Sequence, residues 1–270
     1  MPNSNGAGEI NMIKRSTFVY VAIALAPCAA FAAGPFDGSW KISPSHIQLS
    51  KEPNVYVITA SSYTCSTCAP AYTIKADGTD QKVTGHDYDT VAATVTTTTV
   101  TTVGKLKGKT VWSSKAVASS DGKTFTDEYT NNYGSQPVQF KVISTQVTPP
   151  AAGENALSGS WVETKVVSAS DEGLLQTLGM TDDGFTFSQN GQSYDAKFDG
   201  KKYPITGDPT GTMVVLKKLG PSSVEESDYD KGKLVDVVRM TVSADGKTLH
   251  IVDHNVRANR TNRFTADKQP

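Results

Sequence analysis

The strongest constraint on the fold of this 270-residue chain is an internal duplication. Gly38-Ser39-Trp40 recurs as Gly159-Ser160-Trp161, at an offset of 121 residues. Three more motifs recur in the same order at offsets of 122 to 124 residues: Asp77-Gly78 as Asp199-Gly200, Lys107-Gly108-Lys109 as Lys231-Gly232-Lys233, and Asp121-Gly122-Lys123-Thr124 as Asp245-Gly246-Lys247-Thr248. Ordered matches at nearly constant spacing indicate a tandem duplication of a unit of about 120 residues.

Both copies have the pattern of short β-strands separated by tight turns. Val91–Val103 is rich in Val and Thr, and Val235–Val242 alternates between apolar and polar residues. Asp-Gly and Asn-Gly pairs favour two-residue hairpins because both positions tolerate a positive φ; they occur at 77–78, 121–122, 190–191, 199–200 and 245–246. Only Ser170–Leu178 has the pattern of a helix.

The predicted fold class is therefore all-β, with two tandem antiparallel β-meander units of about eight to ten strands each. A meander of this size closes into an up-and-down barrel or folds into two packed sheets. Closure is the expected outcome because it removes exposed strand edges. Residues 33–147 and 156–270 are expected to form the two barrel-like repeats, and residues 148–155, rich in Pro and Ala, the linker.

Residues 1–32 have the pattern of a bacterial export signal. Lys14 and Arg15 precede the apolar stretch Phe18–Ala26, and Ala30-Phe31-Ala32 supplies the small residues of a cleavage site. The apolar stretch is shorter than the roughly 20 residues that a membrane-spanning helix needs, so no transmembrane segment is expected in the mature chain. We expect a periplasmic or secreted protein.

Two details of this segment stay open. Translation can begin at Met1 or at Met12, which lies closer to the basic residues. Cys28 sits in a sequence similar to a lipoprotein signal, but Pro27 directly before it fits that signal poorly, which favours a soluble product over a lipidated one.

Charge and motif content limit the classes of function. Lys and Arg total 26 and Asp and Glu total 27, a formal net charge of −1, which argues against a nucleic-acid partner. The sequence contains no Gly-x-Ser-x-Gly nucleophile motif, no Gly-rich phosphate loop and no dinucleotide fingerprint. We therefore expect no catalytic residues, no cofactor and a non-enzymatic protein.

The start of each repeat resembles the lipocalin or calycin superfamily. Gly38 and Trp40, and again Gly159 and Trp161, form a Gly-x-Trp motif at the head of a meander of suitable length. The resemblance implies an up-and-down barrel in each repeat, with Trp40 and Trp161 as structural plugs at the closed ends.

The chain departs from that family elsewhere. The family places an Arg from near the last strand over the plug Trp; Arg260 or Arg263 can take this role in the second repeat, whereas the first offers only Lys141. There is no second family signature at the middle hairpin. The alternative interpretation is that both tryptophans are ordinary core residues of another β-meander.

Cys65 and Cys68 are the only cysteines left after export, and they form a C-x-x-C pair. In an oxidising compartment two such cysteines are expected to form a disulfide. Residues three apart in an extended strand lie roughly 10 Å from each other, so the pairing requires a turn. A redox-active dithiol and a metal site are the alternatives, although one C-x-x-C supplies only two metal ligands.

Other polar residues do not form a recognisable site. His250 and His254 lie on one face of a strand about 13 Å apart, too far to share an ion, so we expect solvated residues and no metal site. The acidic segments Asp87–Asp89 and Glu225–Asp230 show no catalytic pair, and alternation along the second would leave alternate carboxylates facing water.

The small residues Ser114, Ala116 and Ala118 suggest where a ligand could bind. They occupy the strand positions that larger residues hold in the second repeat: Val238, Met240 and Val242. If this face points inward, the first barrel is the roomier one. We therefore predict ligand-binding residues Trp40, Ser114, Ala116 and Ala118, and loss of binding when Ala116 is replaced by a bulkier residue.

The sequence thus predicts an exported, non-enzymatic protein that binds a small or apolar ligand inside a β-barrel of this size. One alternative is a structural or protein-interaction module of the cell envelope, with packed barrels and a protein partner of unknown identity. The other is a redox protein that uses Cys65 and Cys68.

Overall fold

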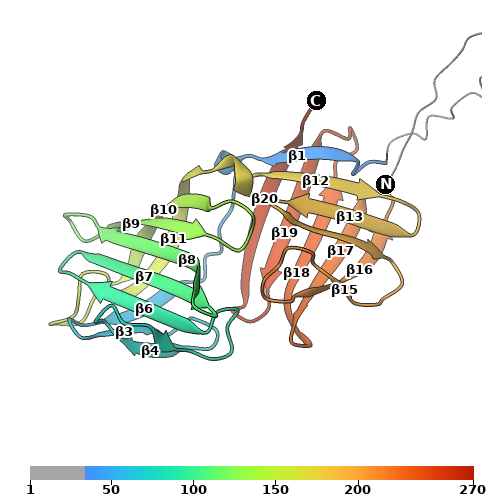
Figure 1. Cartoon of the computed structure of the whole chain (residues 1–270). Helices are drawn as coiled ribbons and strands as arrows, with labels where there is room; N and C mark the ends of the chain where they lie inside the picture. Colours follow the sequence, from blue (N-terminus) through green and yellow to red (C-terminus); the bar gives the residue numbers. More distant parts are fainter. Residues whose placement is uncertain (1–33) are drawn as a thin grey trace, which may run out of the picture. The chain divides into compact units, whose positions relative to one another are not determined.

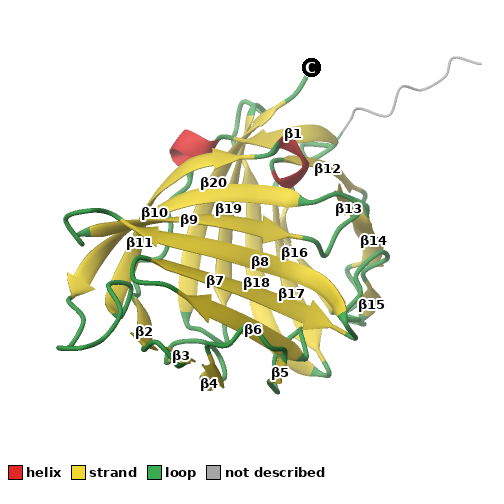
Figure 2. Ribbon diagram, turned by 60° about the vertical axis from the view of Figure 1, so that its left-hand side comes forward, coloured by secondary structure: helices red, strands yellow, loops and turns green. Residues whose placement is uncertain are grey.

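In the computed structural model residues 34–270 are described, and the predicted export signal, residues 1–32, lies outside them. The described residues form twenty β-strands and two single-turn 3-10 helices, so the chain is all-β as predicted (Figure 2). Antiparallel pairing joins the strands into two sheets of ten. No helix among residues 34–270 is long and apolar enough to cross a membrane.

Each repeat contributes ten strands. Those of the first repeat are β1 (Gly38–Ile42), β2 (Asn54–Ile58), β3 (Ser62–Cys65), β4 (Tyr72–Lys75), β5 (Gln81–Lys82), β6 (Thr90–Val95), β7 (Thr99–Leu106), β8 (Lys109–Ala118), β9 (Thr124–Asn131) and β10 (Val138–Thr148). Those of the second are β11 (Gly159–Ala169), β12 (Leu175–Met180), β13 (Gly184–Gln189), β14 (Gln192–Lys197), β15 (Tyr203–Pro204), β16 (Met213–Gly220), β17 (Ser223–Asp230), β18 (Lys233–Val242), β19 (Thr248–Asn255) and β20 (Arg260–Lys268). The 3-10 helices are η1 (Pro44–His46) and η2 (Asp171–Gly173).

The first strand of each repeat is exchanged between the two sheets. The sheet that we call the first barrel has the order β4-β3-β2-β11-β10-β9-β8-β7-β6-β5, and the second barrel has the order β14-β13-β12-β1-β20-β19-β18-β17-β16-β15. Figure 1 shows β1, in blue, beside β12 and β20. Each barrel therefore takes nine strands from one repeat and the tenth from the other.

The exchanged strands occupy equivalent places. Trp161 of β11 pairs with Asn54 of β2 and with Gln146 of β10. Trp40 of β1 lies in the same way between β12 and β20. Both strands begin with Gly-Ser-Trp, and these starts occupy equivalent places in the two sheets. The repeats of the sequence therefore differ from the sheets by one strand.

Each sheet closes on itself almost completely. In the first barrel an isolated bridge joins Asp77, just after β4, to Thr94 of β6. In the second barrel a bridge joins Ser193 of β14 to Thr206, just after β15. The two units are thus nearly closed, barrel-like antiparallel sheets, which confirms the predicted architecture.

The exchanged tryptophans are completely buried and are held alike. Trp40 Nε1 donates a hydrogen bond to the Phe36 carbonyl at 2.8 Å, and Trp161 Nε1 donates to the Leu157 carbonyl at 3.1 Å. The glycine of each motif has a positive φ, and a Cβ at Gly159 would lie 2.2 Å from a backbone oxygen. The positive φ therefore favours glycine at the first position of both Gly-x-Trp motifs, and the nearby backbone oxygen leaves no room for a side chain at Gly159.

The helix predicted for Ser170–Leu178 is wrong. Only η2 and β12 form there. Gln176 and Leu178 are buried whereas Leu175 is 45% exposed, so burial in this segment follows the two-residue period of a strand. Pairing with β1 and β13 overrides the weak helical propensity.

The predicted two-residue hairpin is confirmed at one of the five turn pairs, residues 190–191, which join β13 to β14. Residues 121–122 and 245–246 also join neighbouring strands, β8 to β9 and β18 to β19, but within the longer loops 119–123 and 243–247. Residues 77–78 and 199–200 instead follow β4 and β14, which are end strands of their sheets. These two pairs lie where the barrels close, not in hairpins.

The strand exchange predicts which engineered cysteines can form a crosslink. Ser39 in β1 pairs with Thr177 in β12, and their side-chain oxygens lie 3.4 Å apart. Without exchange, Ser39 would take the place of Ser160 opposite Val55. We expect oxidised Ser39→Cys/Thr177→Cys protein to contain the engineered disulfide, measured by peptide mass spectrometry under non-reducing conditions. Ser39→Cys/Val55→Cys is the matched control, and a crosslink there instead would contradict the exchange.

Candidate functional site

The interior of the first barrel is nearly filled. Ser114 and Ala116 face a cavity of about 40 Å³, which has room for a few water molecules at most. The larger residues Tyr56, Tyr63 and Phe125 line the same cavity and occupy the space that the small ones leave. Ligand pockets usually exceed about 300 Å³, so this interior alone has no room for a ligand of that size.

The other predicted ligand-binding residues lie apart from this cavity. Ala118 packs against the same apolar core as Ala116 but does not line the cavity. Trp40 belongs to the core of the second barrel, so the structure does not bring it together with Ser114. The cation over the ring of Trp40 is Lys268, 5.3 Å from the ring centroid, and not an arginine.

The most prominent polar feature is a cavity of about 660 Å³, called the acidic cavity below. Six aspartates line it: Asp87, Asp208, Asp228, Asp230, Asp236 and Asp253. Side chains from the first barrel complete the wall, among them His86, Tyr88, Asn131 and Tyr133. Its volume lies within the usual range for small-molecule sites.

Strand register explains why carboxylates enter the second barrel. On β17, Val224, Glu226 and Asp228 alternate on one side of the strand, and Val224 and Glu226 are buried. Asp228 lies opposite Asp236 on β18, and Asp253 on β19 lies opposite Val238. The even-numbered residues of β17 thus face the interior, where the strand is apolar at one end and acidic at the other.

The equivalent positions in the first barrel carry different side chains. Gly104 pairs with Trp112 as Asp228 pairs with Asp236, and Tyr129 takes the place of Asp253. A Cβ at Gly104 would lie 2.1 Å from the Trp112 indole nitrogen, so the glycine lets the indole lie against its strand. The same backbone positions are therefore aromatic in one barrel and acidic in the other.

Glu226 and Asp228 form a buried carboxyl pair. The Tyr194 hydroxyl donates a hydrogen bond to Glu226 Oε2 at 2.5 Å. Burial, followed by the nearby Glu226 charge, raises the pKa of Asp228 far above the usual aspartate range. Burial also raises the pKa of Glu226, although its hydrogen bonds with Tyr194 and Asp228 oppose this. Such a pair holds a proton at neutral pH.

Asp236 and Asp253 continue the acidic wall. Burial, and then the charge of Asp253, raise the pKa of Asp236 to about 6, although the amide of Asn255 donates a hydrogen bond to it at 2.8 Å. Burial also raises the pKa of Asp253. Asp236 lies directly opposite Asp228 and diagonally across from Asp253, so the like charges of these carboxylates repel once they ionise and destabilise the fold.

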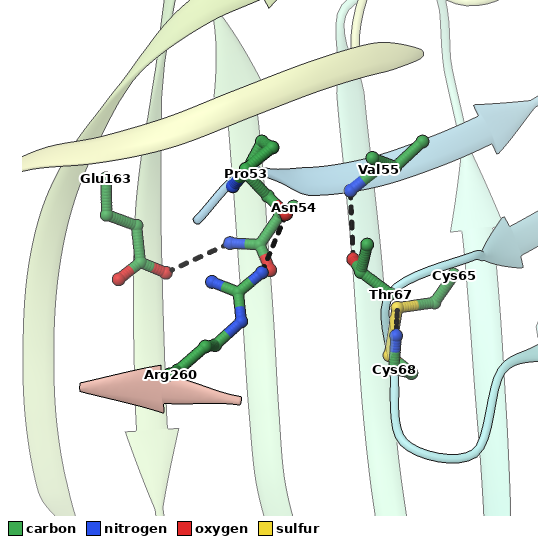
Figure 3. The surroundings of a disulfide bond; sticks show 8 residues. All are labelled: Pro53, Asn54, Val55, Cys65, Thr67, Cys68, Glu163 and Arg260. Atoms are coloured by element: carbon green, nitrogen blue, oxygen red, sulfur yellow. Dashed lines mark hydrogen bonds between the residues drawn. A yellow bond between two sulfur atoms is a disulfide. The ribbon is translucent and has the colours of Figure 1, made fainter. Parts of the chain in front are cut away.

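The two arginines of the cavity are already engaged. Arg257 Nη2 donates a hydrogen bond to Asp230 Oδ2. Arg260 Nη2 donates to the Pro53 carbonyl at 2.7 Å, beside Asn54 and Glu163 (Figure 3). Among residues 34–270, Asp228, Asp236 and Asp253 form no ion pair.

The predicted disulfide lies at the edge of the same cavity. Cys65 and Cys68 are bonded, and the residues between them form a bend, as the predicted turn requires. The Val55 amide donates to Thr67 Oγ1 at 2.9 Å, which fastens the bend to the start of β2 (Figure 3). Since Cys68 lines the acidic cavity, the disulfide bend forms part of its wall.

An aromatic series leads from the cavity into the first barrel. His86 stacks on Tyr88 with ring centroids 4.7 Å apart, and Tyr88 meets Trp112 edge-on at 5.3 Å. Burial lowers the pKa of His86, which favours its neutral form. The cavity therefore has an acidic wall from one barrel and an aromatic wall from the other.

Sequence patterns missed most of this site. His86 and the aspartates on β18 and β19 carry no motif, and the Glu225–Asp230 segment was expected only to leave alternate carboxylates in water. One signal was available, because Glu226 and Asp228 share the strand parity of the apolar Val224. In the described part of the chain, no group of three or more His, Cys, Asp or Glu is placed to hold a metal ion.

The raised pKa of Asp236 predicts a pH-dependent stability. An aspartate in an unfolded chain titrates near about 3.9, and Asp236 in the fold titrates at about 6. The folded state keeps this proton to higher pH, so the stabilisation is complete below about pH 4 and is lost as the pH rises through about 6. Two pKa units correspond to at most about 3 kcal/mol, less for a group that water partly screens.

We expect Asp236→Asn to lose less stability than the wild type as the pH rises through about 6, and therefore to be more stable at pH 7. The measurement is the free energy of unfolding in urea between pH 4 and pH 8. Asp195→Asn, an exposed position on β14, is the charge-matched control. Identical pH dependence in the wild type and Asp236→Asn would contradict the assignment.

Comparison with known proteins supplies no relative for this fold or cavity. The chain matches no protein-family model, no curated protein and no solved structure. The likeness of its two Gly-x-Trp strands to lipocalins therefore stays a prediction from the sequence.

Proposed function

We propose that this is an exported, non-enzymatic protein that binds a small ligand reversibly in the acidic cavity. The observation that carries the proposal is the lining of this cavity of about 660 Å³, where acidic side chains of the second barrel and aromatic side chains of the first meet. Cavities of this size with a few polar groups converging on them are the usual form of small-molecule sites. The disulfide supports an oxidising compartment, in keeping with the export signal expected from the sequence.

The cavity also distinguishes this function from the two alternatives. A packed interaction module needs filled barrels, which suits the first barrel but not the mouth of the second. A redox-active dithiol usually lies at a helix N-terminus that lowers its thiol pKa, whereas Cys65 ends β3, Cys68 lies in the bend that follows, and Cys65 is 2% exposed. Ligand binding also gives a role to the buried aspartates and the aromatic residues that line the cavity, for which the two alternatives supply none.

Native mass spectrometry of the mature chain, purified from periplasm, tests the proposal. We expect extra mass that disappears on denaturation, or that returns after challenge with a small-molecule extract. Ala258→Trp places an indole in the cavity from the turn between β19 and β20, and should abolish this mass. Ala152→Trp makes the same substitution at an exposed position and should retain it.

A third variant locates the ligand. Ala116→Val fills part of the small cavity inside the first barrel and leaves the acidic cavity unchanged. Loss of the ligand in Ala116→Val, with retention in Ala258→Trp, would place binding in the first barrel. A chain that stays bare after the extract challenge would favour a packed module with a protein partner.

A further inference from the structure

The described chain has four buried side-chain N or O atoms without a hydrogen-bond partner, and three of them line the acidic cavity. These three are His86 Nε2, the Tyr133 hydroxyl and Asp228 Oδ1; the fourth is Gln176 Nε2. Buried polar atoms nearly always have partners, so three such atoms around one cavity are positions at which a molecule that enters it can form hydrogen bonds. His86 is only 8% exposed, so its Nε2 belongs to a firmly buried side chain.

The chemistry of these atoms restricts the molecule. A carboxylate oxygen and the free nitrogen of a neutral imidazole accept hydrogen bonds, and a tyrosine hydroxyl can accept or donate. A ligand with several N–H or O–H groups satisfies all three. A ligand rich in acceptors, such as a phosphate or a carboxylate, would place its negatively charged oxygen atoms beside the aspartates of the cavity wall.

Charge restricts it further. Asp228, Asp236 and Asp253 face the cavity without a basic partner among the described residues, because Arg257 and Arg260 are engaged elsewhere. At neutral pH the Glu226–Asp228 pair holds a proton, so Asp236 and Asp253 supply the charge. An entering cation removes the repulsion between these two carboxylates and favours release of the proton that the pair holds, whereas a neutral molecule does neither. Burial strengthens the attraction, since the local dielectric is lower than that of water.

The aromatic wall selects an organic cation over a metal ion. The stacked rings of His86 and Tyr88 line the cavity together with Tyr133. The face of a tyrosine attracts an ammonium group and also covers its carbon atoms. A bare divalent metal would need several oxygen or nitrogen ligands converging on one point.

We propose that the ligand is an aliphatic amine with two or more positively charged nitrogens that carry N–H groups. Its ammonium groups bind the carboxylates of Asp236 on β18 and Asp253 on β19 and donate a hydrogen bond to Asp228 Oδ1 on β17, and its carbon chain lies along the aromatic wall from the first barrel. This inference rests on the proposed function of the acidic cavity. It also explains why one barrel is acidic where its copy is aromatic: the two walls contact different parts of the same ligand.

Isothermal titration calorimetry of the full mature chain with spermidine at pH 7.5 tests the chemical class. Asp236→Asn and Asp253→Asn should each weaken binding by about tenfold or more, which is about 1.4 kcal/mol. Asp195→Asn changes the net charge equally at an exposed site and should leave the affinity within about twofold of the wild type. Removing a buried like charge stabilises the fold, so lost binding does not reflect unfolding.

A second ligand tests the need for N–H groups. Spermidine methylated on every nitrogen to the quaternary state keeps the three charges but cannot donate to His86 Nε2 or Asp228 Oδ1. We expect it to bind at least about tenfold more weakly than spermidine. His86→Phe keeps the aromatic wall and should reduce this difference; equal affinities for the two compounds in the wild type would overturn the role of the N–H groups.

The remaining outcomes separate this inference from the proposed function. Spermidine binding that is insensitive to Asp236→Asn and Asp253→Asn would be non-specific and would overturn the amine. A retained ligand that depends on Ala258 but has no basic nitrogen would overturn the amine and leave the proposed function standing. If spermidine does not bind but the retained ligand is another amine, the class is confirmed. If nothing is retained or bound, both proposals fall.

Discussion

Burial of a single indole from the opposite repeat completes the core of each barrel. Trp40 is fully enclosed by the strands of the second repeat and Trp161 by those of the first, each with its indole N–H bonded to a carbonyl four residues earlier. Truncating a buried tryptophan costs about 3–5 kcal/mol, a large share of the stability of an ordinary domain. Because each repeat supplies the tryptophan that its neighbour needs, the two barrels depend on one another although each has its own core.

The two barrels share the same strand arrangement but differ in the side chains that face their interiors. Strand register is the same in both barrels, yet Gly104, Trp112 and Tyr129 occupy the positions of Asp228, Asp236 and Asp253. Large aromatic side chains fill the interior of the first barrel at these positions. The smaller aspartate side chains of the second barrel fill less space and repel one another when ionised, so a cavity remains beside them. The two copies thus provide separate walls of one cavity.

Sequence patterns predicted the strands and the disulfide because these depend on residues close together in the sequence, and they predicted the duplication because its motifs recur in order. They could not predict the exchange of β1 and β11, since both strands begin with the same Gly-Ser-Trp motif. Ser170–Leu178 was misread because its burial is set by pairing with β1, more than a hundred residues away. The acidic cavity was missed because side chains such as His86 and Asp253 meet only through the closure of the sheets.

The exchange also sets an order for folding as the chain emerges. β1 is synthesised first, but its partners β12 and β20 follow more than a hundred residues later. Until β11 appears, the edges of β2 and β10 are unpaired, and β1 carries the same Gly-Ser-Trp start that β11 places between them. An unexchanged first barrel is therefore a kinetic competitor during synthesis or translocation, and reaching the exchanged state from it requires β1 to leave. The speed at which the second repeat emerges thus helps to decide which partner β1 keeps.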